Sequence, residues 1–256
     1  MTEYEGFTVD TRDGVATITL DVPGKFNRVT LGARAQLDEV FARLGADDAV
    51  RFVVVTGAGG AFTAGGDIAS FLEAGPEELS RLHWNVAAPE RCPKPVVAKL
   101  RGYAFGVGLE LALACDFRLA AEDVELALPE VKLGMIPGSG GTQRLVRLIG
   151  LARAKDAIMR GRRIGAEEAL AFGLVTQVVP AEELDAAVDG LIAELAELSP
   201  LALSMAKRVL DLAEESPLHV GLHVEGLAYG LLRSTHDFRE GVEAFGEKRK
   251  PKFEGR

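Results

Sequence analysis

Short strand-like segments alternate with helical patterns in the first part of the chain. Residues 15–20, VATITL, place every second residue on one apolar face, which predicts a half-buried strand. Apolar residues at helical spacing predict a helix over 33–44. The continuous β-branched run at 51–56, RFVVVT, is typical of a strand covered on both faces. Further strands are expected at 95–101, 117–120, 124–128 and 175–179.

From about residue 181 onward the pattern is almost entirely helical. The segments AEELDAAVDGLIAELAEL and LALSMAKRVLDLAEE carry apolar residues three and four positions apart. Strands that are separated by helices or long glycine loops imply an α/β fold with crossover connections. We therefore expect an α/β core with the active site over residues 1–195, followed by a helical region over residues 196–256.

Composition and charge narrow the class of protein. The 256 residues are 48% hydrophobic and 26% charged, which is an ordinary globular mixture. A net charge of -9 argues against nucleic-acid or membrane partners, because either needs a positive surface. The chain has no run of 18 apolar residues and no visible signal peptide, so we expect a cytoplasmic protein. Cys92 and Cys115 form no C-x-x-C motif and are expected to be buried free thiols.

Two glycine-rich loops come close to known motifs without matching them. The run VVVTGAGGAF lacks a dinucleotide fingerprint, because Phe62 and Ala61 stand where glycine would be required. The run IPGSGG resembles a nucleophile elbow around Ser139, but Pro137 replaces its first glycine. These mismatches argue against a nicotinamide site and a serine nucleophile. Ser139 or Thr142 is instead expected to be the N-cap of a helix.

Two glutamates stand in apolar surroundings. Glu110 is the one charged residue of GYAFGVGLELALAC, and Glu130 follows a proline at a strand end. A carboxylate is rarely buried without a partner or a chemical role. Brought together, the two groups could hold a water molecule and exchange its protons. Alternatively, each could be the buried partner of Arg101, Lys132 or Arg144. Glycoside hydrolysis is disfavoured because only 6% of the residues are aromatic.

Several motifs in a fixed order resemble one family. They are PGKFN at 23–27, GAFTAGGDI at 60–68, the segment 94–120, LALPEVKLGMIPGSGGTQRLVRLIG at 126–150 and AFGLVTQVVP at 171–180. Together they resemble the crotonase, or enoyl-CoA hydratase/isomerase, superfamily over nearly the whole chain. The resemblance implies a spiral of strand–strand–helix turns. It also implies that the C-terminal helical region assembles homotrimers, often paired into hexamers.

The resemblance further implies an acyl-CoA thioester substrate whose enolate is stabilised by two backbone N–H groups. Those donors fall on Gly66 and Val107. At the position of Val107, the family usually has glycine. Glu110 and Glu130 match the two glutamates of hydratase members. The implied reaction is the hydration of a 2-enoyl-CoA to a 3-hydroxyacyl-CoA. In it, Glu110 helps deprotonate water for attack at C3, and Glu130 delivers a proton to C2.

Residues expected to contact coenzyme A or the acyl group also follow from the resemblance. Phe245 and Lys248 are expected to act on the ligand of a neighbouring subunit, and Lys25 to meet a phosphate. The expected set is Lys25, Ala64, Gly65, Asp67, Ile68, Phe105, Gly106, Phe245 and Lys248. A lysine typical of the family is absent, since Gly60 occupies its place.

Coenzyme A enters as part of the substrate, so no separate cofactor is expected. No metal is expected either, because His219 and His223 lack the glutamate of an H-E-x-x-H motif. Within the fold, the alternatives are an enoyl-CoA isomerase or an aromatic acyl-CoA hydratase-lyase. A non-catalytic or RNA-binding member is a further alternative, which the acidic charge and both glutamates argue against.

Overall fold

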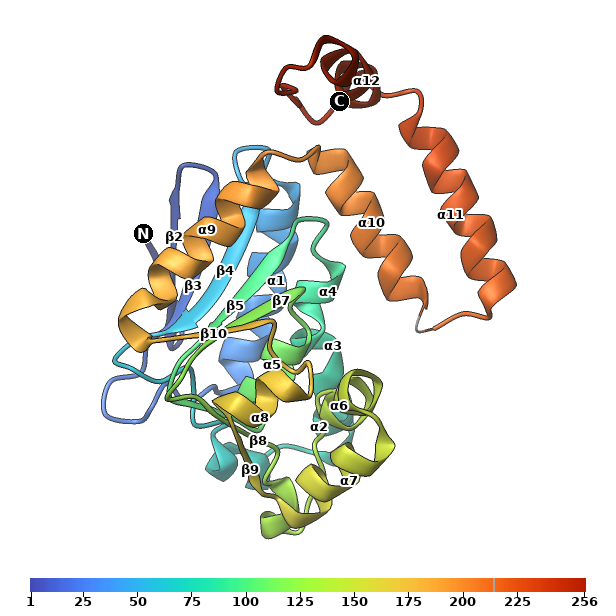
Figure 1. Cartoon of the computed structure of the whole chain (residues 1–256). Helices are drawn as coiled ribbons and strands as arrows, with labels where there is room; N and C mark the ends of the chain where they lie inside the picture. The colour runs from blue at the N-terminus through green and yellow to red at the C-terminus, as the bar shows by residue number, and fades with distance from the viewer. Residues whose placement is uncertain (214) are drawn as a thin grey trace. The chain divides into compact units, whose positions relative to one another are not determined.

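The computed structural model describes residues 1–213 and 215–256. The chain divides into two compact units. The first is an α/β unit made of Met1–Cys92 and Val96–Val188, and the second is a helical unit made of Pro93–Pro95 and Asp189–Arg256. Figure 1 shows the strands of the α/β unit side by side, and the helices α10 and α11 of the helical unit running next to each other.

A seven-stranded sheet forms the centre of the α/β unit, in the order β1-β2-β3-β4-β5-β7-β10. The strands β1, β2 and β3 pair antiparallel, whereas β3, β4, β5, β7 and β10 pair parallel. Parallel neighbours need crossover connections, so this sheet confirms the expected α/β class. The strands are β1 (Thr2–Tyr4), β2 (Phe7–Arg12), β3 (Val15–Leu20), β4 (Phe52–Gly57), β5 (Val96–Leu100), β7 (Phe117–Ala121) and β10 (Gln177–Val179).

A second, three-stranded sheet gives the fold its spiral turns. It contains β6 (Tyr103–Phe105), β8 (Glu125–Ala127) and β9 (Arg163–Gly165), with β6 and β8 parallel. In two successive turns, β5 followed by β6 and β7 followed by β8, the chain adds one strand to each sheet before the next helical segment. The sequence pattern did not predict the strands β1, β2, β6 and β9, and three of them, β1, β6 and β9, are only three residues long.

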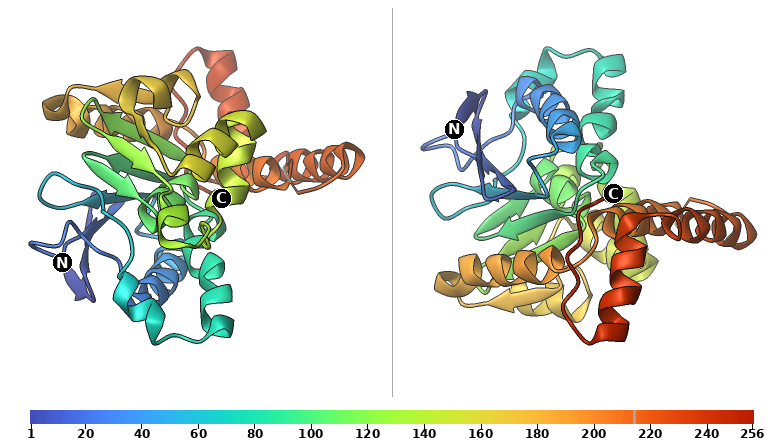
Figure 2. Two further views of the ribbon diagram at one scale, coloured as in Figure 1. Left: turned by 90° about the horizontal axis from the view of Figure 1, so that it is seen from below. Right: turned by 90° about the horizontal axis from the view of Figure 1, so that it is seen from above.

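Helices connect the strands of the α/β unit. The helix α1 extends two residues further at each end than the predicted 33–44 and is capped by Thr30, whose side chain accepts the Ala33 N–H. It contacts α3 and α4, which Figure 2 shows beside it. The helices are α1 (Leu31–Ala46), α2 (Pro76–Ser80), α3 (Leu82–Val86), α4 (Ala88–Arg91), α5 (Val107–Leu113), α6 (Gly141–Ile149), α7 (Leu151–Arg160) and α8 (Ala166–Ala171). Three 3-10 helices are η1 (Ile68–Leu72), η2 (Glu130–Leu133) and η3 (Ala181–Glu183).

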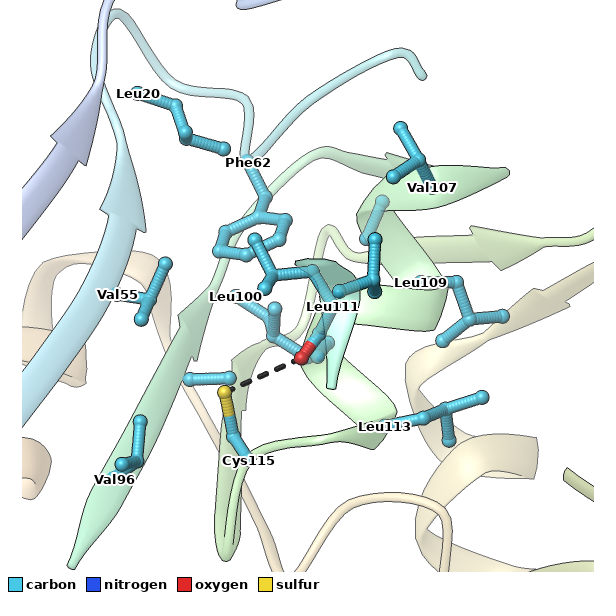
Figure 3. Close-up of a cluster of buried hydrophobic side chains, with 14 of the residues drawn as sticks. Leu20, Val55, Phe62, Val96, Leu100, Val107, Leu109, Leu111, Leu113 and Cys115 are labelled. Atoms are coloured by element: carbon cyan, nitrogen blue, oxygen red, sulfur yellow. Dashed lines mark hydrogen bonds between the residues drawn. The ribbon is translucent and has the colours of Figure 1, made fainter. Parts of the chain in front are cut away.

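The core holds α5 firmly against the main sheet. Side chains such as Leu111 and Phe62 pack with Leu20, Val55 and Leu100 in one apolar cluster (Figure 3). Close packing of this kind leaves little freedom for the helix to shift or rotate. The position of Glu110, which belongs to α5, is therefore set by the core.

Both cysteines are buried free thiols, as expected. The Cys115 thiol donates to the Leu111 carbonyl at 3.3 Å, at the C-terminal end of α5. Arg118 supports the same end, because its buried guanidinium donates to the carbonyls of Ala112, Cys115 and Leu174. Six polar groups, namely a thiol, a guanidinium and four carbonyls, thus meet where α5 ends and the chain enters β7.

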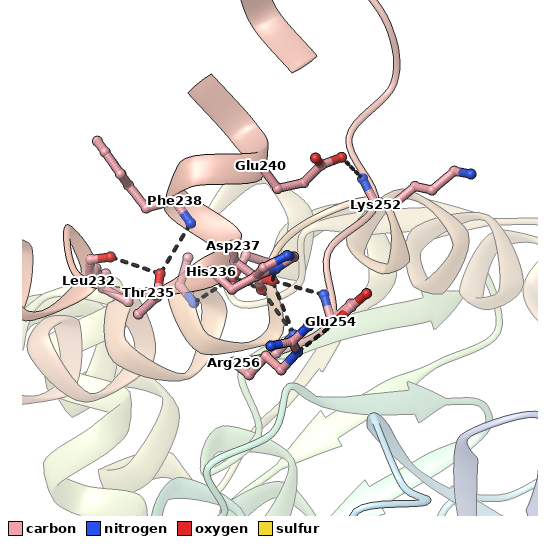
Figure 4. Close-up of polar contacts among 12 residues, drawn as sticks. Leu232, Thr235, His236, Asp237, Phe238, Glu240, Lys252, Glu254 and Arg256 are labelled. Atoms are coloured by element: carbon pink, nitrogen blue, oxygen red, sulfur yellow. Dashed lines mark hydrogen bonds and ion pairs between the residues drawn. The ribbon is translucent and has the colours of Figure 1, made fainter. Parts of the chain in front are cut away.

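The helical unit ends in a cluster of hydrogen bonds around Asp237, whose side chain is 2% exposed (Figure 4). Its carboxylate accepts the Ser199 hydroxyl at 2.7 Å and the N–H groups of Glu254 and Gly255. Its own N–H donates to the Arg256 carbonyl. The last residues of the chain are thereby tied to the start of α12. The helices here are α10 (Pro200–Ala213), α11 (Leu218–Leu232) and α12 (His236–Glu247), while α9 (Leu184–Ala196) begins in the α/β unit.

Among the described residues, the helices are too short or too polar to cross a bilayer.

Candidate active site

A pocket of about 130 Å³ in the α/β unit contains both glutamates. It lies where η1, the start of α5, η2 and the loop before α6 meet. Most of its wall is apolar or glycine, which favours an acyl chain over a polar ligand. The apolar side chains include Ile68, Phe71, Leu79, Leu82, Leu133, Met135 and Ile136, and the polar ones are Arg34, Glu110, Glu130 and Ser139.

Glu110 is the fourth residue of α5 and is 2% exposed. Its Oε1 accepts the backbone N–H of Ser139 at 2.7 Å and of Gly141 at 3.0 Å. A Cβ at position 141 would lie 3.0 Å from the same oxygen, so glycine is needed for this approach. Burial raises the pKa of Glu110, while these N–H groups and then the charge of Arg34 oppose the rise.

Glu130 begins η2, directly after β8 and Pro129. Its Oε2 is buried and has no hydrogen-bond partner. Burial, together with the nearby charge of Glu110, raises the pKa of Glu130 to about 7. This carboxyl therefore exchanges its proton near neutral pH, as an acid–base catalyst must.

Gly106 lets Glu130 approach the start of α5. Its φ of +53° belongs to a region that side chains rarely adopt, and a Cβ would lie 3.1 Å from Glu130 Oε1. Gly106 also precedes Val107, the first residue of α5. The same glycine thus orients the helix start and makes room for a carboxylate beside it.

The salt-bridge alternative for the two glutamates is wrong. Arg101 pairs with Asp123 at 3.2 Å, and Arg144 pairs with Glu90 at 2.7 Å. Lys132 is exposed. Within residues 1–213 and 215–256, neither glutamate of the pocket forms an ion pair.

Two backbone N–H groups at the pocket are free to donate to a ligand oxygen. Val107 begins α5, so its N–H has no partner within the helix. Among the described residues, no acceptor is found for the Gly66 N–H, although both of its neighbours in the chain bond to Val29. The Val107 side chain is buried and lines the pocket without a positive φ. Valine therefore keeps the N–H that glycine would offer and adds an apolar wall.

Arg34 and Ser139 belong to the pocket, although the sequence analysis did not place Arg34 there. Arg34 is 3% exposed, and the spacing 34, 37, 41 and 44 puts it on the apolar face of α1. A charged residue within that stripe was the signal that could have found it. Ser139 is not the predicted cap, because the N-cap of α6 is Gly140 and has no side-chain bond. Thr142 is likewise already inside α6.

The structure brings only some of the predicted coenzyme A residues to the pocket. Asp67 accepts Arg28 Nη1 at 3.1 Å beside the pocket wall. Lys25 is exposed in the turn before α1, and Phe105 contacts the ring of Tyr103. Of the predicted coenzyme A residues, those that line the pocket are Ala64, Gly65, Ile68 and Gly106. Phe245 and Lys248 are exposed residues of the helical unit.

The fold and this pocket define a crotonase-type protein. The solved enoyl-CoA hydratase of Bacillus anthracis has a TM-score of 0.92 with 38% identity, covering 98% of this chain and 100% of that chain. The chain belongs to the enoyl-CoA hydratase/isomerase family, whose sequence model matches residues 10–256.

Two relatives carry the names of specific hydratases. The (E)-benzylidenesuccinyl-CoA hydratase of Thauera aromatica is 36% identical, over 97% of this chain and 98% of the relative. The crotonyl-CoA hydratase of Syntrophomonas wolfei is 35% identical, over 98% of each chain. Similarity at this level supports an enzyme of the hydratase/isomerase class.

Proposed function

We propose that this protein adds water to a 2-enoyl-CoA thioester and forms a 3-hydroxyacyl-CoA. The observation that carries the proposal is the pair of glutamates in one apolar pocket, neither of them consumed by an ion pair. The names of the two relatives support hydration over a shift of the double bond. Coenzyme A enters with the substrate, and the chemistry needs no other cofactor.

In the proposed reaction, the thioester oxygen accepts the N–H groups of Gly66 and Val107. These donors stabilise the negative charge that develops on that oxygen when water attacks. Glu110 takes a proton from the water molecule while the water oxygen bonds to C3. The electron pair of the double bond then takes the proton of Glu130 at C2. The proton gained by Glu110 resets Glu130 through water, so that one water molecule is consumed.

The environments of the two carboxyls fit these separate roles. Burial raises the pKa of Glu110 as well, but this carboxylate accepts two backbone N–H groups, which favour its ionised form and oppose the rise. The pKa of Glu130 is raised to about 7, mainly by burial, so it still holds a proton near neutral pH. A general base and a general acid are thus provided by two residues of the same type.

We further propose that the helical unit assembles trimers or hexamers. The helix α11 exposes large apolar side chains that a lone soluble chain would not favour. They include Leu222, Leu227, Tyr229 and Leu231, which are 55%, 63%, 76% and 61% exposed. Light scattering should give a mass three or six times that of one chain, and a monomer would contradict the proposal.

The decisive experiment follows the loss of conjugated thioester absorbance when purified protein is added to crotonyl-CoA, then to longer and aromatic 2-enoyl-CoAs. Glu110→Gln and Glu130→Gln should each lower turnover at least ~100-fold, as expected when a general acid or base is removed. The exposed Glu39 on α1 provides the control, and Glu39→Gln should keep full activity. Inactivity of the wild type on the whole series, or activity in both pocket variants, would contradict the proposal.

A further inference from the structure

Arg34 is a buried cation at the pocket with no part in the proposed reaction steps. Its side chain is 3% exposed and Nη1 donates to Ser139 Oγ at 3.2 Å. Its Nε is buried without a hydrogen-bond partner. A guanidinium keeps its charge even when buried, so this site carries a fixed positive charge.

The guanidinium is held in place on several sides. Its Cζ lies 5.4 Å from the ring centre of Phe71. A Cβ at Gly66 would lie only 2.8 Å from Nη2, so the glycine leaves space for the group. The head of Arg34 is therefore packed at the pocket wall and cannot extend into solvent.

Ser139 links Arg34 to Glu110. The hydroxyl of Ser139 accepts from the guanidinium, and the backbone N–H of the same residue donates to Glu110 Oε1. Neither Glu110 nor Glu130 forms a direct ion pair with Arg34 in the part of the chain that the structure describes. The cation thus acts on the carboxyls through space and through Ser139.

The charge of Arg34 favours the state in which one of the two glutamates is ionised and the other is protonated. With one glutamate ionised and the other protonated, the sum of Arg34 and the two carboxyls is zero. With both ionised, the sum is one negative charge in an apolar pocket, which is unfavourable. Other charged groups nearby are paired, since Asp67 binds Arg28 and Arg144 binds Glu90.

We propose that Arg34 is a positioning residue that keeps Glu110 ionised through Ser139 and thereby leaves the shared proton on Glu130. The proposal rests on the proposed hydration and explains why two like residues take different roles. Burial raises the pKa of both glutamates, and the charge of Arg34 opposes that rise at each of them. Glu110 also accepts two backbone N–H groups, which oppose the rise of its pKa further.

The test uses Arg34→Met and Arg34→Lys, with Arg43→Met on the exposed side of α1 as control. Carbon NMR of labelled glutamate side chains gives the titration midpoints, which are assigned with Glu110→Gln and Glu130→Gln. Arg34→Met should raise the Glu110 midpoint by about one pH unit or more, as expected when a nearby opposite charge is lost. Arg34→Lys should restore most of the shift, and Arg43→Met should leave it unchanged.

Kinetics provide the second measurement. In Arg34→Met, the acidic limb of the pH profile of kcat/KM should move up with the midpoint. We expect a loss of about tenfold at acidic pH that largely disappears at alkaline pH. A merely structural role would lower the rate equally at every pH, and that result would overturn the proposal.

Unchanged midpoints in folded Arg34→Met would also overturn it. If that variant fails to fold, Arg34→Gln decides, because it removes the charge but keeps a polar side chain and should raise the Glu110 midpoint in the same direction. The NMR titration needs no turnover. A wild type that hydrates no enoyl-CoA therefore refutes the proposed function, whereas unchanged midpoints refute the role of Arg34.

Discussion

Glu130→Gln should make the protein more stable at alkaline pH while it removes activity. In the folded protein the pKa of Glu130 rises from its ordinary value of 4.5 to about 7, with burial as the main cause. One unit of pKa corresponds to about 1.4 kcal/mol, so ionising this carboxyl inside the fold costs about 3 kcal/mol. The folded chain holds a proton here that the unfolded chain releases between pH 4.5 and about 7. Stability therefore falls as the pH rises through that window.

Glutamine keeps the shape of the side chain without its charge, so the variant avoids this loss. The free energy of unfolding of Glu130→Gln, measured by denaturant against wild type, should gain about 3 kcal/mol between pH 4.5 and pH 8. Each kcal/mol should raise Tm by about 2–4 °C for a chain of this size. Glu39→Gln is the control and should show no such trend. A difference between variant and wild type that stays flat across this range would refute the assigned burial and charge of Glu130.

Three further changes test other parts of the structure. Gly106→Ala should cost about 1–3 kcal/mol of stability and lower kcat, because a side chain at φ +53° is strained and presses on Glu130. Calorimetry would show the loss of stability, and the hydration assay would show the loss of kcat. An alanine variant equal to wild type in both measurements would contradict this prediction. Arg118→Met should lower the free energy of unfolding by about 3 kcal/mol or more, since three carbonyls at the end of α5 each lose a hydrogen bond from the buried guanidinium. Denaturant titration should detect this loss, and a neutral effect would be inconsistent with the bonds described. Asp237→Asn should destabilise by about 2 kcal/mol at neutral pH and less in acid. Burial opposes ionisation of Asp237, but its donors hold its pKa below the usual value, so its contribution is lost as the pH falls. Melting curves that shift equally at neutral and acidic pH would argue against that role.

Periodicity predicted those parts of the fold whose residues repeat a buried pattern. The strand at 15–20 coincides with β3, the run at 51–56 overlaps β4 in all but its last residue, and the run at 95–101 contains β5. Such strands lie inside the sheet, where burial on one or both faces imposes the pattern. Strands β6 and β9 are three residues long, which is too short for alternation to be recognised.

The glutamates could be predicted because a lone charge in an apolar segment needs an explanation. Their surroundings could not. From the sequence, the cations considered as partners were Arg101, Lys132 and Arg144, whereas the charge at the pocket comes from Arg34 on α1. Contacts between segments that are distant in sequence depend on the packing of α1, α5 and the loop before α6. No local pattern records that packing.

The role of Ser139 was hidden for a related reason. A serine before a helix resembles a cap, because capping is the commonest local use of such a residue. In the fold, glycine takes the N-cap position of α6, and Ser139 turns its N–H to Glu110 and its hydroxyl to Arg34. A residue that serves two distant partners carries no signature at its own position.

The central claim is that water adds across the double bond of a 2-enoyl-CoA, and isotopic labelling tests it most directly. The enzyme would be incubated with 2-enoyl-CoA in deuterated water that carries heavy oxygen, and the product analysed by NMR and mass spectrometry. We predict a 3-hydroxyacyl-CoA with the heavy oxygen on C3 and one deuterium on C2, formed by wild type and at least ~100-fold more slowly by each glutamine variant. A product whose double bond has moved without taking up heavy oxygen would contradict the account.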